Sequence, residues 1–197
     1  MVLREVDVAI VGSGPYALSL AAHLQARNVE FRIFGPPMKF WRDMPAGINL
    51  KSFGFATNVY VPASGHTFSE WCRSNGLEDH EPCTMASFAK YGMSITDRFV
   101  PGIEPVEVSR VSATRSGRFE IVLASEERLR ARRVVFATGL SHLEYTPEVL
   151  SGLSELATHT AHIEDYDRFR GQSVAVLGAG ASAIEAGALV RESGGEA

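Results

Sequence analysis

Cysteine is scarce in this sequence of 197 residues, which contains only Cys72 and Cys83. The two do not form a Cys-x-x-Cys pair, and no cluster of histidines accompanies them. A redox-active dithiol and a metal site are therefore both disfavoured. We expect two reduced thiols, as is typical of a cytoplasmic protein, and no metal.

An excess of positive charge is also lacking, because 19 Lys and Arg residues face 23 Asp and Glu residues, a net charge of −4. Such a chain presents no general basic field to nucleic acid, and we expect no nucleic-acid partner. The densest basic run, Arg128–Arg133, alternates with Leu129 and Ala131. This pattern favours the solvent side of a strand over the alternative, a phosphate-binding patch.

Long apolar runs are missing, and none approaches the length that spans a membrane. No basic segment with an apolar core and a cleavage site precedes the first strand-like pattern, so we expect no signal peptide and a cytoplasmic location. With 45% hydrophobic and 21% charged residues, the composition is that of a globular protein that buries a core.

The chain opens with the pattern of a βαβ unit. Val6–Val11 is rich in β-branched residues and predicts a buried strand. A glycine-rich turn at Gly12–Ala17 leads into a helix over Tyr16–Arg27, and Glu30–Phe34 predicts a second strand. The unit has the size expected for a right-handed crossover.

The turn carries the fingerprint G-x-G-x-x-A. Gly12 allows a tight turn, Gly14 lets a pyrophosphate approach the backbone, and small Ala17 lets helix and strand pack closely. The helix N-terminus then offers free N–H groups to the phosphates. We therefore predict dinucleotide binding rather than a turn without a ligand, at Gly12, Ser13, Gly14, Pro15, Tyr16 and Ala17.

One expected element is absent from this unit. The acid that usually holds the ribose hydroxyls should follow the second strand, near Gly35, where the sequence reads Phe34-Gly35-Pro36-Pro37. We therefore expect another group to bind the ribose, such as a backbone group.

Further along, the patterns predict an irregular loop over residues 35–62 and two helices, over residues 67–75 and 84–99. Three strands follow, at residues 107–114, 118–124 and 128–136, and then a connector over residues 138–170. The opening pattern then recurs. A strand at Ser173–Leu177 precedes a second glycine-rich turn, GAGASA, and a helix over Ala181–Ser193. The predicted binding residues of this turn are Gly178, Gly180, Ser182 and Ala183.

The segments GSGPYALSLAAHL, FGPPMKFWRDMP, VVFATG and GAGASAIEAG resemble the two-dinucleotide-binding flavoproteins, and among them the class B flavin-dependent monooxygenases. The resemblance covers the whole chain. It implies FAD on the first fingerprint, NAD(P)H on the second, and a return strand that passes the flavin at Ala137, Thr138 and Gly139. It also implies flavin contact for Trp41 and for residues 47–52, with a hydrophobic cluster of Trp41, Phe53 and Phe55 as the alternative.

The connector is also similar to the class B signature in part, through His162-x-x-x-Tyr166. His142, His159 and His162 have a second interpretation, as polar residues that order a loop. Disulfide reductases share the double-Rossmann plan, but they need a reactive cysteine pair beside the flavin, which this sequence lacks.

Together these features predict an α/β fold, with a Rossmann-like FAD-binding βαβ unit and a β-meander followed by the start of a second Rossmann domain. We expect the FAD-binding domain over residues 1–166 and the first βα unit of an incomplete NAD(P)-binding domain over residues 171–197.

The expected function is an FAD-dependent, NAD(P)H-using oxidoreductase, a monooxygenase acting on a small molecule with molecular oxygen. The alternatives are a truncated, non-catalytic flavin-binding fragment or interaction module, and a reductase without oxygenation. No residue stands out as an acid, base or nucleophile. Without the rest of the second domain, the apolar faces of Ser173–Leu177 and of Ile184, Leu189 and Val190 would lack partners, which predicts self-association. The residue that selects NADH or NADPH would fall at or past Ala197.

Overall fold

The computed structural model describes residues 3–79, 82–153 and 156–197. They form two compact units, residues 1–42 with 50–139, and residues 43–49 with 140–197, which we treat separately. The predicted domain boundary at residue 166 concerns the longer family fold and stays a prediction. In this structure residues 140–166 group with the C-terminal helix.

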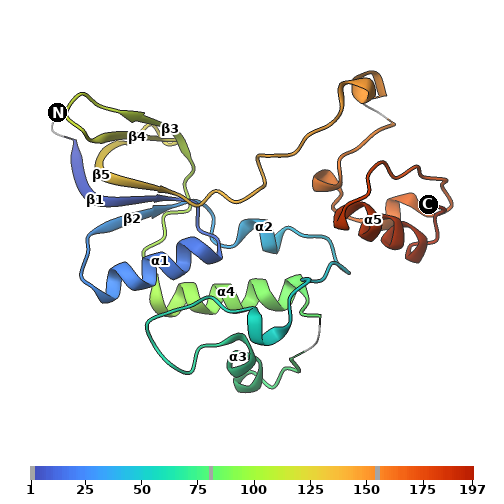
Figure 1. Cartoon of the computed structure of the whole chain (residues 1–197), viewed down its shortest axis with the longest axis horizontal. Helices are drawn as coiled ribbons and strands as arrows, with labels where there is room; N and C mark the ends of the chain where they lie inside the picture. The colour runs from blue at the N-terminus through green and yellow to red at the C-terminus, as the bar shows by residue number, and fades with distance from the viewer. Residues whose placement is uncertain (1–2, 80–81, 154–155) are drawn as a thin grey trace. The chain divides into compact units, whose positions relative to one another are not determined.

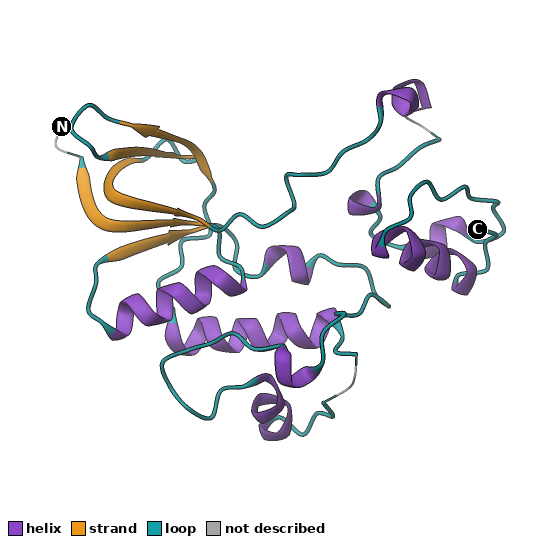
Figure 2. Ribbon diagram, viewed as in Figure 1, coloured by secondary structure: helices purple, strands orange, loops and turns teal. Residues whose placement is uncertain are grey.

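The first unit contains a five-stranded mixed sheet in the order β2-β1-β5-β4-β3 (Figures 1 and 2). Strand β1 (Arg4–Val11) pairs in parallel with β2 (Phe31–Phe34) and with β5 (Arg128–Phe136). Strand β4 (Phe119–Leu123) runs antiparallel between β5 and β3 (Val108–Ala113). The α/β Rossmann-like fold predicted from the sequence is confirmed.

Helices α1 (Pro15–Ala26) and α4 (Met85–Phe99) lie together beside the sheet (Figure 1). They bury apolar side chains with Val8, Ile10 and Ile33 of the sheet, in a core that also receives α3 (Phe68–Ser74). A capping box between Thr67 and Glu70 begins α3, and the Thr84 hydroxyl caps α4. The loop predicted over residues 35–62 contains a short helix, α2 (Lys39–Arg42), and a 3₁₀ turn at Gly54–Ala56.

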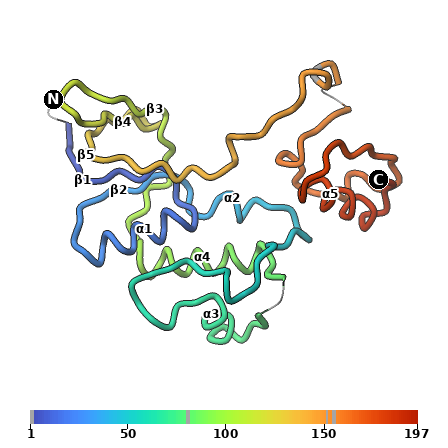
Figure 3. The backbone as a smooth tube through the Cα atoms, in the orientation of Figure 1, coloured from blue at the N-terminus to red at the C-terminus, as the bar shows by residue number. Residues whose placement is uncertain are grey.

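The second unit contains α5 (Ala181–Glu192) and three 3₁₀ segments, Glu148–Leu153, Thr160–His162 and Tyr166–Phe169. Ile163, Tyr166, Ala186, Leu189 and Val190 form its core. The backbone of residues 140–153 and 156–197 is irregular outside these segments (Figure 3).

The strand predicted at Ser173–Leu177 is wrong for this structure, since only Ser173 makes an isolated parallel bridge, to Glu196. A strand needs a neighbour along its length, and the described residues supply only Glu196. The expectation that the apolar face of the last helix lacks packing partners is also wrong in part, because Leu189 and Val190 are buried. Leu177 and Ile184 are exposed as expected, each at 72%.

Among the described residues, no helix is long and apolar enough to cross a membrane.

Candidate dinucleotide-binding site

The first glycine turn is closed against the strand that returns beside it. Gly12 has a φ of +106°, and a Cβ at this position would overlap the carbonyl of Ala137. The Gly12 N–H donates to the Phe34 carbonyl at 2.9 Å, and the Ala137 N–H donates to the Val11 carbonyl at 2.8 Å. The turn is thus held by main-chain contacts to both neighbouring strands, a geometry that only glycine allows.

Gly14 has a different environment. Its φ is −82°, and a Cβ there would meet no protein atom within 4 Å. Gly14 is the N-cap of α1, and no side chain caps the helix. The protein itself therefore gives no reason for glycine here, and no side-chain cap occupies the N–H groups of the first turn, as a phosphate site requires.

The other fingerprint residues divide between the core and the surface. Ala17 is buried in the core that α1 shares with the sheet. Pro15 occupies the first turn of α1, where its missing N–H costs nothing. Ser13 is buried and donates its hydroxyl to the Gly35 carbonyl at 2.8 Å. Tyr16 is 89% exposed, so its ring makes no core contact.

The predicted return segment does reach the glycine turn. Ala137 directly follows β5 and touches Gly12, and Gly139 has a φ of +68° that turns the chain away. Phe136, at the end of β5, is largely exposed. The structure therefore brings Gly12–Ala17 and Ala137–Gly139 together at the carboxyl ends of β1 and β5, the edge where α/β sheets bind ligands.

The segment after β2 is tied to the same turn. The Met38 N–H donates to the Ser13 carbonyl at 3.1 Å, and the Gly35 N–H donates to the Glu104 carbonyl at 2.9 Å. Sequence reasoning missed Glu104, because nothing local to that residue indicates that it extends the sheet beyond β2. The pairing of Phe34 with Glu104 depends on α4 returning the chain to this edge.

Trp41 lies in α2, three residues after Met38. Its ring packs edge-on against Phe88 of α4 at 5.1 Å between centroids. Phe53 and Phe55 stack on each other and are exposed. The three rings therefore do not form one cluster, and flavin contact by Trp41 stays a prediction. Residues 47–52 are divided between the two units.

The second glycine turn repeats the geometry of the first. Gly178 has a φ of +150°, and Gly180 is the N-cap of α5 without a side-chain cap. A Cβ on Gly180 would meet nothing within 4 Å. Ser182 is exposed at the first turn of α5, and Ala183 is half-buried behind Gly178. This turn also presents an open helix N-terminus.

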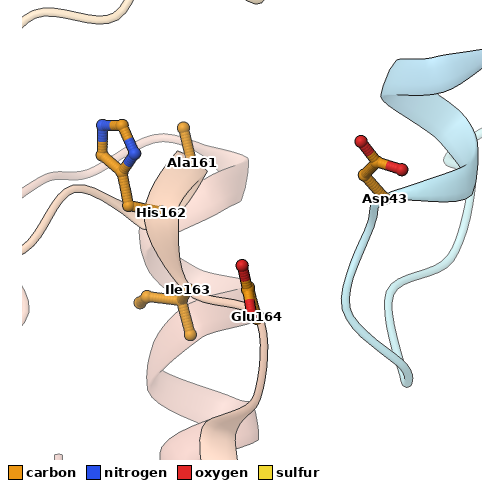
Figure 4. Close-up of a pocket in the computed structure, with 5 residues that line it drawn as sticks. All are labelled: Asp43, Ala161, His162, Ile163 and Glu164. Atoms are coloured by element: carbon orange, nitrogen blue, oxygen red, sulfur yellow. The ribbon is translucent and has the colours of Figure 1, made fainter.

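Two histidines of the connector, His159 and His162, make local contacts. His159 Nδ1 accepts from the Ala161 N–H at 3.1 Å, which is the loop-ordering role. His162 Nε2 lies 3.2 Å from a Glu144 carboxylate oxygen, and Tyr166 is buried in the core of the second unit. A shallow pocket of about 450 Å³ is lined by Asp43, Ala161, His162, Ile163 and Glu164 (Figure 4), and none of these belongs to a glycine turn.

Both cysteines are free and buried. Burial raises the pKa of the Cys83 thiol to about 11, and burial also raises the pKa of Cys72. A raised pKa disfavours the reactive thiolate form of both side chains at neutral pH. This agrees with the expectation that these cysteines are not a dithiol redox pair.

Comparisons with known proteins agree with this geometry. No curated protein matches the chain in sequence. Among solved structures, a flavin-containing monooxygenase from Stenotrophomonas maltophilia is similar over 98% of this chain and 56% of its own length, with a TM-score of 0.79 and 24% identity. Bacillithiol disulfide reductase from Bacillus cereus is similar over 98% of this chain and 57% of its own, with a TM-score of 0.77 and 17% identity.

A third structure, OTEMO in complex with FAD and NADP, is similar over 96% of this chain and 37% of its own, with a TM-score of 0.70 and 15% identity. These likenesses establish the fold, and the chain spans about 56% of the length of the monooxygenase. The family described as pyridine nucleotide-disulphide oxidoreductase matches residues 9–196, which contain both glycine turns and the strands between them. The chain therefore belongs to the pyridine nucleotide-disulphide oxidoreductase family.

Proposed function

We propose that the chain forms the FAD-binding part and the beginning of the NAD(P)H-binding part of an oxidoreductase of the monooxygenase type, acting on a small molecule with molecular oxygen. The observation that carries the proposal is the repeated geometry of the two glycine turns. At Gly14 and at Gly180 alike, glycine begins a helix where a side chain would meet no protein atom. The OTEMO structure, a fold relative, is described as a complex with FAD and NADP.

The residues of the first turn fit a dinucleotide. The N–H groups at the start of α1 would hold the pyrophosphate, and the absent side chain of Gly14 leaves room for it. Gly12 and Ala137–Gly139 would form the wall of the site beside the isoalloxazine end. When bound, FAD supplies the redox chemistry, as hydride acceptor and as the group that reacts with oxygen.

In the second turn, Gly178, Gly180, Ser182 and Ala183 would hold the pyrophosphate of NAD(P)H in the same way, with the Ser182 hydroxyl as an additional donor. Among the described residues we assign no proton donor or base.

A reductase without oxygenation is the second candidate, because the fold is about as similar to a disulfide reductase as to a monooxygenase, with TM-scores of 0.77 and 0.79. The raised thiol pKa of Cys83 argues against a dithiol route through this chain's own cysteines. Purified protein supplied with FAD and NAD(P)H under air distinguishes the two. Oxygenated substrate supports the monooxygenase, whereas flavin reduction with peroxide release alone supports the reductase.

A substitution at Gly14 tests the first site. We expect Gly14→Val to lower FAD affinity by more than about tenfold, because the side chain occupies the pyrophosphate position, with the unfolding midpoint nearly unchanged. Flavin fluorescence titration measures the affinity. Gly102→Val is the matched control, since a Cβ on Gly102 also meets nothing within 4 Å, but away from the turn. Wild-type FAD affinity in Gly14→Val contradicts the site.

A parallel substitution tests the second site. We expect Gly180→Val to leave FAD affinity unchanged and to weaken NAD(P)H binding, measured by quenching of nicotinamide fluorescence. Gly152→Val serves as control within the same unit, because a Cβ on Gly152 meets nothing within 4 Å. Loss of FAD from Gly180→Val would mean that the two fingerprints are assigned to the wrong cofactors. A chain that binds neither cofactor supports the non-catalytic fragment instead.

A further inference from the structure

The corner that follows β2, residues Gly35–Met38, occupies the place where dinucleotide-binding folds usually carry a ribose-binding acid. Gly35 has a φ of +115° and is buried. A Cβ on Gly35 would lie 3.5 Å from the Ser13 hydroxyl oxygen. That is an ordinary contact distance, but an acidic side chain here would be strained by the backbone conformation, so the corner disfavours the usual carboxylate.

The same corner has no main-chain donor to offer in its place. The Gly35 N–H donates to the Glu104 carbonyl at 2.9 Å, and the Met38 N–H donates to the Ser13 carbonyl at 3.1 Å. The two residues between them are prolines and have no N–H. The corner therefore presents carbonyl oxygens, which accept from hydroxyl groups but cannot bind a phosphate.

Ser13 fixes the corner from both ends. Its carbonyl accepts from Met38, and its hydroxyl donates to the Gly35 carbonyl at 2.8 Å. Ser13 is only 4% exposed, so its hydroxyl links the glycine turn to the corner and does not face a ligand.

A carboxylate does lie beside the end of β2, but it is neutralised. Glu104 pairs with Phe34 through the backbone, and its side chain makes two hydrogen bonds with Arg32, at 2.6 Å from Nε and 2.5 Å from Nη2. A carboxylate held in this bidentate way has its charge compensated and its main acceptor positions occupied.

We propose that the first site binds the adenosine ribose through neutral main-chain carbonyls of the Gly35–Met38 corner in place of a carboxylate, and that Ser13 is the positioning residue for this contact. The inference rests on the proposed FAD site at Gly12–Ala17. The Met38 carbonyl already accepts from the Trp41 and Arg42 N–H groups, so the inference assigns the ribose acceptor to the Pro37 carbonyl and to the second lone pairs of the Gly35 and Pro36 carbonyls.

Competition titrations test the inference. The chain is titrated with FAD, and ADP or 2′-deoxy-ADP then competes for the site. A hydroxyl bound by a neutral carbonyl contributes less than one bound by a carboxylate, so we expect 2′-deoxy-ADP to bind weaker than ADP by about two- to tenfold. A ratio well above tenfold would indicate a charged acceptor and overturn the inference.

Ser13→Ala separates a positioning role from a merely structural one. We expect ADP to bind about threefold to tenfold more weakly, with the ADP to 2′-deoxy-ADP ratio falling toward one, because the acceptor is displaced. A structural role would weaken both ligands equally and would overturn the role of Ser13. Ser109→Ala is the matched control. Ser109 lies on the far edge strand β3, and its hydroxyl also donates to a main-chain carbonyl, that of Val122 on β4.

Glu104→Gln tests the competing acceptor. We expect its ADP to 2′-deoxy-ADP ratio to equal that of the wild type, and a ratio that collapses would assign the ribose to Glu104 and overturn the inference. If the wild-type chain binds neither FAD nor ADP, the proposed cofactor site fails, and the inference fails with it. FAD binding with a ratio well above tenfold overturns the inference alone.

Discussion

Gly12 and Gly14 lie two residues apart, and the structure gives each a different reason to lack a side chain. At Gly12 the reason lies in the protein, because the backbone has a positive φ and the Ala137 carbonyl is close. At Gly14 the backbone is ordinary and the space is open. One position therefore serves stability, and the other leaves room for the proposed dinucleotide.

We expect Gly12→Ala to destabilise the chain by about 2–4 kcal/mol even without a cofactor, from backbone strain and overlap with Ala137. Urea unfolding of the cofactor-free chain measures the effect. Gly117→Ala is the control for strain alone, since Gly117 has a φ of +72° and a Cβ there meets nothing within 4 Å. Equal destabilisation by the two variants would show that the contact with Ala137 contributes nothing.

The backbone geometry of the first glycine turn could be predicted where the reason is local, whereas its binding role stays a prediction. The spacing of Gly12, Gly14 and Ala17 follows from the turn itself and could be read directly. The hydrogen bond of the buried Ser13 hydroxyl could not be predicted, because its partner Gly35 is 22 positions away and has no side chain to signal a contact.

At the scale of elements, Arg32 connects three segments that are far apart in the chain. From β2 its guanidinium reaches Glu104 beyond α4 and, at 2.7 Å, Glu127 in the turn between β4 and β5. The hydrogen bond from Arg32 lowers the pKa of Glu127 below its ordinary 4.5, and the bond to Glu104 raises the pKa of Arg32. These ion pairs link the edge strand β2 to the β4–β5 turn of the antiparallel meander and to the segment after α4.

We expect Arg32→Met to lower the free energy of unfolding at pH 7 by about 1–2 kcal/mol, a modest figure because both glutamates are partly exposed to solvent. A carboxylate with a lowered folded pKa stabilises above its unfolded pKa and loses this contribution as pH falls through the folded one. The stability difference between the wild type and the variant should therefore shrink progressively as the pH falls below about 4.5.

Denaturant unfolding at pH 7 and at stepwise lower pH measures that convergence. Arg118→Met is the control, because the Arg118–Glu5 pair is more exposed and should change stability by less than about 0.5 kcal/mol. A difference between wild type and Arg32→Met that stays constant with pH would show that Glu127 is not stabilised through Arg32.

The elements that the sequence predicts well are those with local signals. The bounds of β1, α1 and β2 differ by three residues or fewer from the predicted ranges, and β5 is identical. The strand at Ser173–Leu177 failed because apolar composition predicts the tendency to pair, whereas pairing itself requires a neighbouring strand. Helix α2 was missed because it is a single turn among prolines and aromatics.

At the scale of the whole molecule, the chain passes between its two units three times, after residues 42, 49 and 139. The short segment 43–49 packs within the second unit, where Ile48 lies against the core and Gly47 comes close to Leu189. The third passage leads into residues 140–147, which are exposed and contain no helix or strand.

We expect limited chymotrypsin digestion to cut first after Leu143 or Tyr145, because both are exposed in a segment with few backbone hydrogen bonds. Phe53 and Phe55 are equally exposed but lie in a hydrogen-bonded 3₁₀ turn and should be cut later. Mass spectrometry identifies the sites, and a first cut in the 3₁₀ turn would contradict the prediction.

The two pieces should remain together on a native gel-filtration column and separate in urea, because Ile48 belongs to the first piece and its packing partners to the second. Ile48→Asp should let the pieces separate without denaturant. Fragments of the wild-type chain that elute apart would show that segment 43–49 contributes little. Self-association through exposed Leu177 and Ile184 remains a proposal, and the same column reports it.

The insertion of residues 43–49 also limits how this family can exchange parts. A gene fusion that joins one relative's first 139 residues to another's remainder would place a loop from one parent inside a core from the other. Such a hybrid would mismatch at Gly47 and Ile48 although its junction lies almost a hundred residues away. Recombination between relatives should therefore yield folded hybrids mainly when the loop and the C-terminal region come from the same parent.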